Sequence, residues 1–134
     1  MQLVPIATHR NSKAEDRLNR ATLAKPLFWA ATAFAYVMAV LPHPPEVPGA
    51  PSDKVQHVIA FATLGFLAAW AFPNTSRLQL WVRLSLFGAF IELSQAIPAL
   101  HRDADVVDWI ADTIACGLAL LIVGWWRSRK RNSA

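Results

Sequence analysis

Nine polar residues that could do chemistry occur in three short stretches of this 134-residue chain. We call them the polar cluster: Asp53, Lys54 and His57, then Glu92 and Gln95, then Arg102, Asp105, Asp108 and Asp112. Carboxylates beside a histidine can carry out general acid–base chemistry, and lysine and arginine can hold an anionic group. Each stretch lies at the edge of an apolar run, so the elements built from those runs decide whether the nine side chains meet.

Helical spacing places members of each stretch on a shared face. Asp53 and His57 are four residues apart, and Glu92 and Gln95 are three apart. Residues three or four apart are neighbours on a helix surface. Each pair is therefore expected to present its two side chains in the same direction.

The third stretch forms an acidic stripe. Asp105, Asp108 and Asp112 step by three and then four residues, so the stripe descends about 10 Å along a helix at ~1.5 Å per residue. If the helix enters a membrane, Asp112 lies within the hydrocarbon, where a carboxylate costs a few kcal/mol. We expect Asp112 to face the interior and to be protonated or paired with a basic side chain of the polar cluster.

Composition indicates that these helices cross a membrane. The chain is 54% hydrophobic and 16% charged, against about 45–50% and about 25% in ordinary soluble domains. A soluble helical bundle is disfavoured, because the apolar runs have no polar face. The net charge of +4 would suit nucleic-acid binding, but the basic residues gather at the two termini, as they do beside membrane spans. No nucleic-acid partner is expected.

Four apolar runs are separated by turn-forming segments. The runs cover residues 27–41, 55–72, 78–97 and 106–126, and the separator at 43–52 holds four prolines and a glycine. The first run is short, since a helix crossing ~30 Å of hydrocarbon usually needs about 20 apolar residues. We therefore expect local thinning of the bilayer, or flanking residues that reach outward, at that span.

The basic residues predict the topology. Five of the 13 Lys and Arg precede residue 26 and four follow residue 126, and cytoplasmic flanks carry such an excess. If both termini are cytoplasmic, the number of spans must be even. Arg77 and Arg83 then lie on the cytoplasmic side, and only Lys54 and Arg102 lie outside. We predict an all-α protein with four transmembrane helices. Its parts are a basic cytoplasmic tail at 1–26, the membrane domain at 27–127 and a second basic cytoplasmic tail at 128–134.

This topology brings the polar cluster together at the outer mouth, where two chemistries are open. In one, Lys54 and Arg102 clamp an anionic head group while Gln95 and His57 donate hydrogen bonds to it. In the other, Glu92 or His57 acts as a general acid or base in a half-buried site. The residue types do not rank these two.

Two further interpretations remain open. His57 with Glu92, Asp108 and Asp112 offers one nitrogen and several oxygen donors for a divalent metal, although no compact metal motif is present. Alternatively, the polar cluster ties the helix ends together by ion pairs and hydrogen bonds, with no substrate.

The three stretches together resemble the VanZ-like family of small membrane proteins. Residues 53–57 resemble the family's DKxxH segment after a proline-rich loop, Glu92 to Gln95 its ExxQ, and residues 102–112 its closing R…D…D…N run. The resemblance covers about residues 27–127. The chain departs from the family in having Asp112 in place of Asn and Ala115 in place of Gly, and Gly117 is expected to supply part of the close helix approach.

The resemblance implies a multi-pass protein of the bacterial inner membrane with a role in the cell envelope. The family's name comes from a member associated with low-level teicoplanin resistance, an association that transfers less well than the envelope role. We predict catalytic roles for His57, Glu92 and Asp108, and binding roles for Lys54, Gln95, Arg102, Asp53, Asp105 and Asp112. The ligand would be an amphiphile such as a phospholipid or lipid-linked glycan precursor.

The alternative function is a non-catalytic membrane partner that packs into a larger envelope complex or against copies of itself. It predicts that the polar cluster is paired internally and that lipid-facing surfaces carry the function. Trp70, Trp81 and Trp109 are the residues expected on those surfaces.

Overall fold

The computed structural model describes residues 8–42, 49 and 51–133, which form four α-helices and one 3₁₀ turn. The helices are α1 (Thr8–Val40), α2 (Asp53–Ala71), α3 (Arg77–Gln95) and α4 (Val106–Asn132), with η1 (Pro98–Leu100) between α3 and α4. No strand occurs in this part of the chain, in agreement with the all-α prediction.

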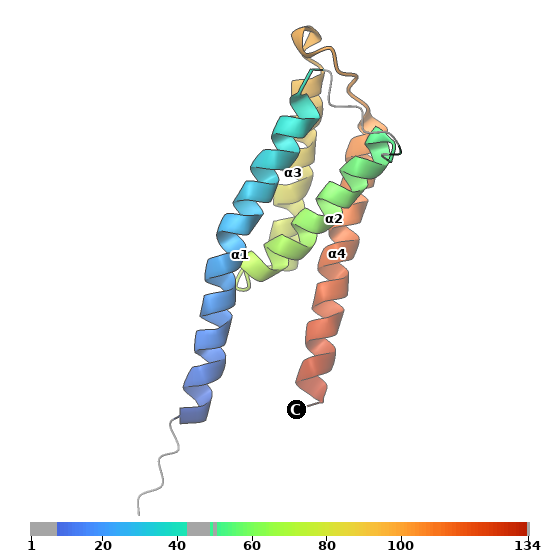
Figure 1. Cartoon of the computed structure of the whole chain (residues 1–134). Helices are drawn as coiled ribbons and strands as arrows, with labels where there is room; N and C mark the ends of the chain where they lie inside the picture. The colour runs from blue at the N-terminus through green and yellow to red at the C-terminus, as the bar shows by residue number, and fades with distance from the viewer. Residues whose placement is uncertain (1–7, 43–48, 50, 134) are drawn as a thin grey trace, which may run out of the picture.

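The helices run alternately up and down, so the connections gather at two ends (Figure 1). One end holds the last turn of α1, the first turn of α2, and the loop from α3 to α4. We call it the polar end, because the polar cluster lies there. The other end, which we call the basic end, holds the turn from α2 to α3. The N-terminal half of α1 and the last turns of α4 extend beyond that turn (Figure 1).

Three of the helices contain segments long and apolar enough to cross a membrane: Thr22–Val40, Asp53–Ala71 and Val106–Asn132. The remaining helix, α3, has 19 residues, as α2 does, but it carries Arg77, Arg83 and Glu92 and is less apolar. The protein is thus a helical membrane protein with three span-like helices. A fourth crossing by α3, with cytoplasmic termini, remains a prediction.

The first span differs from its sequence-based prediction. Helix α1 continues through Pro26, and its part Thr22–Val40 is long and apolar enough to cross a membrane, so the span is not confined to residues after 26. Proline lacks an N–H and cannot donate to the carbonyl four residues earlier, which is why it suggested a boundary. The apolar segment has 19 residues, close to 28 Å of helix at ~1.5 Å per residue. Local thinning is therefore not required.

Polar and apolar residues are distributed as expected for a protein surrounded by lipid. The buried set contains apolar side chains such as Phe61 and Leu64 together with the polar His57 and Asp112. Large apolar side chains cover the outside; Leu93, for example, is 72% exposed. Such extensive apolar exposure marks a surface in contact with a bilayer rather than with water.

Close contact between α2 and α4 positions the site. A Cβ atom on Gly65 would lie 2.9 Å from the carbonyl oxygen of Cys116 and 2.9 Å from the Cβ of Ala119. Small residues permit this approach of two backbones. Gly117, expected to supply part of a close helix approach, does so toward α3, because a Cβ atom there would lie 2.9 Å from Trp81 Nε1. Gly65 therefore sets the α2–α4 distance.

Candidate functional site

Lys54 links the first turns of α2 and α4. Its Nζ atom lies 3.0 Å from Asp105 Oδ2 and 2.6 Å from Asp108 Oδ1. The Lys54 side chain is 48% exposed and that of Asp105 is 46% exposed, whereas Asp108 is largely covered. The residue predicted to hold an anionic head group thus already has two carboxylate partners.

Arg102 makes the second outer ion pair. Its guanidinium donates to Asp53 Oδ2 at 2.8 Å, which connects the loop after α3 to the first turn of α2. Asp53 also lies near the helix N-terminus, where the helix dipole favours negative charge. Both basic residues predicted to bind a ligand are therefore neutralised by the polar cluster itself.

Asp105 caps α4. Its Oδ1 atom accepts from the N–H of Val107 at 2.8 Å, and its own N–H donates to Glu92 Oε2 at 2.7 Å. The pKa of the Asp105 carboxyl is lowered from its ordinary value of 3.8, first by the Val107 N–H and then by the Lys54 ammonium. Glu92 thus joins α3 to the start of α4, and Asp105 is held as a carboxylate.

His57 and Asp112 form a buried pair one turn deeper than the outer ion pairs. His57 Nδ1 lies 3.2 Å from Asp112 Oδ2, and the two side chains are 9% and 2% exposed. The second oxygen of Asp112, Oδ1, is buried and has no hydrogen-bond partner among the described residues. An unsatisfied buried acceptor costs about 1–3 kcal/mol, so it needs an explanation.

Gln95 does not point toward the other members of the polar cluster. It is buried, and its Nε2 atom donates to the carbonyl oxygen of Ala39 at 3.0 Å. Ala39 is in the last turn of α1, where carbonyls lack intrahelical partners. Beside it, Tyr36 and Ser94 bring their hydroxyl oxygens within 3.3 Å, a contact that the motif spacing did not indicate. The geometry therefore assigns Gln95 to holding α1 against α3.

The arrangement does not favour a metal centre. Among the described residues, no group of three or more His, Cys, Asp and Glu side chains is placed to hold a metal ion. The predicted donors have other partners: Glu92 accepts from the Asp105 N–H, Asp108 binds Lys54, and Asp112 contacts His57.

Two of the three indole groups predicted to face lipid also join α3 to α4. Trp109 Nε1 donates to the carbonyl oxygen of Ser85 at 3.0 Å, and Trp81 Nε1 donates to that of Thr113 at 2.9 Å. The hydroxyl groups of Ser85 and Thr113 lie 2.9 Å apart between them. Trp81 is nevertheless 38% exposed, and Trp70, at 48% exposed, has no such bond within the described part of the chain. An indole N–H within hydrocarbon needs an acceptor, and the facing helix supplies it.

Comparison with known proteins supports the resemblance. A model of the family described as VanZ/LLP1 matches residues 1–127, which include the basic N-terminal segment and every residue of the polar cluster. Searches of curated proteins and of solved structures found no match. Because the family model covers nearly the whole chain, the chain belongs to the VanZ/LLP1 family.

Proposed function

We propose that this protein acts in the bacterial cell envelope, in the inner membrane, by binding the head group of an amphiphile at its polar end. The ligand would be a phospholipid or a lipid-linked glycan precursor, and His57 would exchange a proton with it. The observation that carries the proposal is the buried His57–Asp112 pair, whose Asp112 Oδ1 atom has no partner among the described residues.

The outer ion pairs can open for a ligand. Lys54 and Asp105 are about half exposed, and exposed ion pairs contribute little to stability because water competes for both charges. A phosphate group offers Lys54 and Arg102 the same charge-assisted contacts that their aspartates now provide. If Lys54 and Arg102 exchanged their aspartate partners for a phosphate group, the His57–Asp112 pair would become accessible at a small cost in free energy.

The deeper pair has the arrangement of an oriented base. Asp112 fixes the His57 ring through Nδ1, which leaves Nε2 as the nitrogen for a ligand. Histidine is suited to proton exchange near neutral pH, and a carboxylate on Nδ1 sets which nitrogen reacts. Glu92 and Asp108 are close enough to His57 to interact electrostatically, so a bound anion would act on all three.

A second candidate function is a non-catalytic membrane partner. Lys54 and Arg102 are each paired with aspartates of the polar cluster. This favours the second candidate, because a purely structural role requires no ligand. If this candidate is right, substitutions in the polar cluster change the stability of the protein but do not change the binding of any ligand.

Binding measured by native mass spectrometry separates the two. We would titrate the purified full chain with a polyprenyl phosphate and with phosphatidylethanolamine. The polar-end variants are His57→Gln and the double variant Lys54→Gln/Arg102→Gln. The control is Arg129→Gln/Lys130→Gln, which loses the same two positive charges at the basic end. The proposal expects at least one ligand to bind about tenfold more weakly to the polar-end variants only. Equal binding to all folded variants would refute it.

A further inference from the structure

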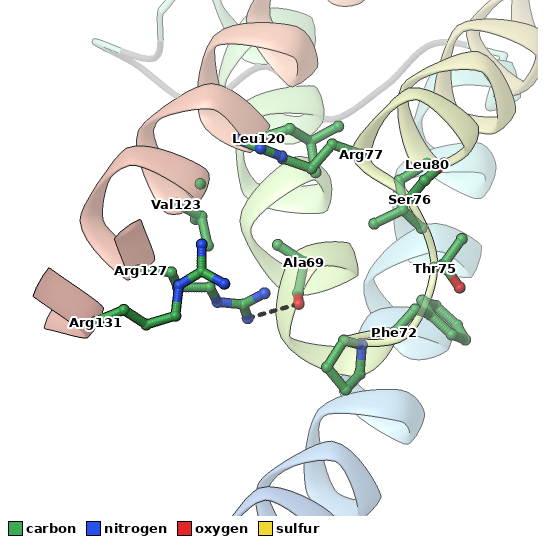
Figure 2. Close-up of a pocket in the computed structure, with 12 residues that line it drawn as sticks. Ala69, Phe72, Thr75, Ser76, Arg77, Leu80, Leu120, Val123, Arg127 and Arg131 are labelled. Atoms are coloured by element: carbon green, nitrogen blue, oxygen red, sulfur yellow. Dashed lines mark hydrogen bonds between the residues drawn. The ribbon is translucent and has the colours of Figure 1, made fainter. Parts of the chain in front are cut away.

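A second polar site lies at the basic end, far from the polar cluster. A cavity of about 250 Å³ opens between the end of α2, the start of α3 and the last turns of α4 (Figure 2). We call it the arginine cavity, because Arg77, Arg127 and Arg131 line it. Thr75 and Ser76 add hydroxyl groups to its wall, and none of the described residues that line it is acidic.

Specific contacts hold two of the three arginines in place. The guanidinium of Arg127 donates to the carbonyl oxygen of Ala69 at 2.8 Å, in the last turn of α2. Arg77, the first residue of α3, lies over Gly124 of α4 so closely that a Cβ atom there would collide with its guanidinium. Arg131 follows Arg127 by four residues and so lies on the same helix face. Three positive groups from two helices thus surround one space (Figure 2).

The other two basic residues near the end of α4 are arranged differently. Arg129 lies 4.2 Å from the centroid of the Trp125 ring, and Lys130 lies 4.1 Å from that of Trp126. Each of these cations is thus stabilised by an aromatic face. Because they carry the same charge and sit in the same helical turns, they separate an effect of the cavity from an effect of general positive charge.

The arginine cavity has the chemistry of a phosphate site. Guanidinium groups present paired N–H donors that match phosphate oxygens, and clustered like charges are destabilising until an anion joins them. The Ser76 Oγ atom accepts from the Gln79 N–H, so its hydroxyl hydrogen remains to donate. The first turn of α3 adds the positive end of a helix dipole on the same side.

We propose that the arginine cavity binds the phosphate group of a phosphate ester, with Arg77 and Arg131 as the ligand-binding side chains. Arg127 keeps the end of α2 in place beside them. Two sources carry this chemistry: an anionic phospholipid of the adjoining leaflet, or a free phosphate compound.

The test measures binding of short-chain phosphatidylglycerol to the full chain in detergent, with inorganic phosphate as competitor. Arg77→Gln/Arg131→Gln should weaken binding at least about tenfold, while Arg129→Gln/Lys130→Gln, with the same charge loss, should change it less than about twofold. Gly124→Leu should also weaken binding, because its side chain displaces the Arg77 guanidinium without changing the charge. Arg127 is left unchanged to protect the bond to Ala69.

Each outcome bears on the proposal. Inorganic phosphate that displaces the lipid at micromolar concentration identifies a free phosphate compound as a sufficient ligand, whereas displacement only at concentrations far above the lipid's own Kd identifies the lipid head group as the source. Equal weakening by both double variants would reduce the effect to general surface charge and overturn the proposal, as would absence of binding to the unaltered chain. Arg77→Gln/Arg131→Gln should weaken binding by the same factor in the unaltered chain and in the His57→Gln background, so failure here is distinguishable from failure of the function proposed for the polar end.

Discussion

His57 and Asp112 come from different helices, yet His57 Nδ1 and Asp112 Oδ2 lie 3.2 Å apart in the buried part of the bundle. The pair depends on the close approach of α2 and α4 at Gly65, two helical turns from His57. One hydrogen-bond acceptor of the pair is unsatisfied, because Asp112 Oδ1 accepts no hydrogen bond among the described residues. A stability measurement can determine how strongly the two residues depend on each other.

We expect His57→Gln and Asp112→Asn to be non-additive. Each single change removes one partner of a buried contact and should cost roughly 1–3 kcal/mol, and the double variant should recover about 0.5–3 kcal/mol of the summed loss. Unfolding in detergent, followed by circular dichroism, provides the four free energies of the cycle. Strict additivity would show that the 3.2 Å contact contributes no coupling.

Asp105 should make stability depend on acid pH. Its pKa is lowered by the Val107 N–H and the Lys54 ammonium, so its stabilising effect is present above the ordinary value of 3.8. As pH falls below 3.8 the unfolded state takes up the proton first, and the effect is lost as pH passes through the lower folded pKa. The thermal midpoint should therefore decrease more over this range in the unaltered chain than in Asp105→Asn.

Asp105→Ala separates the charge from the cap. Asparagine is a good helix N-cap and alanine is a poor one, so Asp105→Ala should have a lower thermal midpoint than Asp105→Asn at pH 3 as well as at pH 7. Identical thermal midpoints for the two variants at both pH 3 and pH 7 would contradict the capping role of Asp105 Oδ1.

Gly65→Ala should destabilise the bundle more than Gly88→Ala. The new Cβ at position 65 would meet the backbone carbonyl oxygen of Cys116 at 2.9 Å, and backbone cannot move without shifting a helix. At position 88 the nearest atoms belong to the Trp109 and Phe61 rings, at 3.2 and 3.3 Å, and side chains can adjust. We expect a loss of about 1–3 kcal/mol for Gly65→Ala, measured by thermal unfolding in detergent. An equal loss at the two sites would contradict this account.

Four crossings can be tested by cysteine labelling. The single native cysteine, Cys116, is fully buried and would be replaced by alanine as background. In intact cells, a membrane-impermeant maleimide should label Ala104→Cys, in the loop at the polar end. Asn74→Cys and Ser133→Cys, at the basic end, should react only after permeabilisation. Labelling of Asn74→Cys and Ala104→Cys from the same side would mean that α3 does not cross.

The helices were predictable from the sequence because their apolar runs are bounded by prolines and polar residues. The start of the first span was not, because Pro26 suggests a boundary, whereas the helix continues through it. A proline ends a helix only where the lost hydrogen bond is not offset by the rest of the structure. In α1, the apolar residues from Thr22 onward lie on both sides of Pro26.

The spacing of the acidic stripe was informative about which residues share a face, but not about their partners. Lys54 binds Asp105 and Asp108, and Gln95 binds the Ala39 carbonyl, because helix distances and loop paths bring those atoms together. Such distances depend on close contacts like that of Gly65, which residue spacing along one helix does not report.

Two other features were missed for a related reason. From composition alone, aromatic residues are expected to mark the lipid surface and basic residues the topology. In the structure, Trp81 and Trp109 hold α3 to α4, and Arg77 and Arg131 line one cavity. Both groups act through contacts between helices, which composition alone cannot assign.

The hydrogen bonds between α3 and α4 have a consequence for how the chain is made. Helix α3 contains no segment as apolar as the span-like segments of the other three helices, and it carries two arginines and a glutamate, so its own partitioning from the translocon into lipid is weak. Trp81 and Trp109 find their acceptors only when both helices are present. We therefore expect α3 to remain beside the translocon until α4 leaves the ribosome, and the two helices to enter the bilayer together as a hairpin.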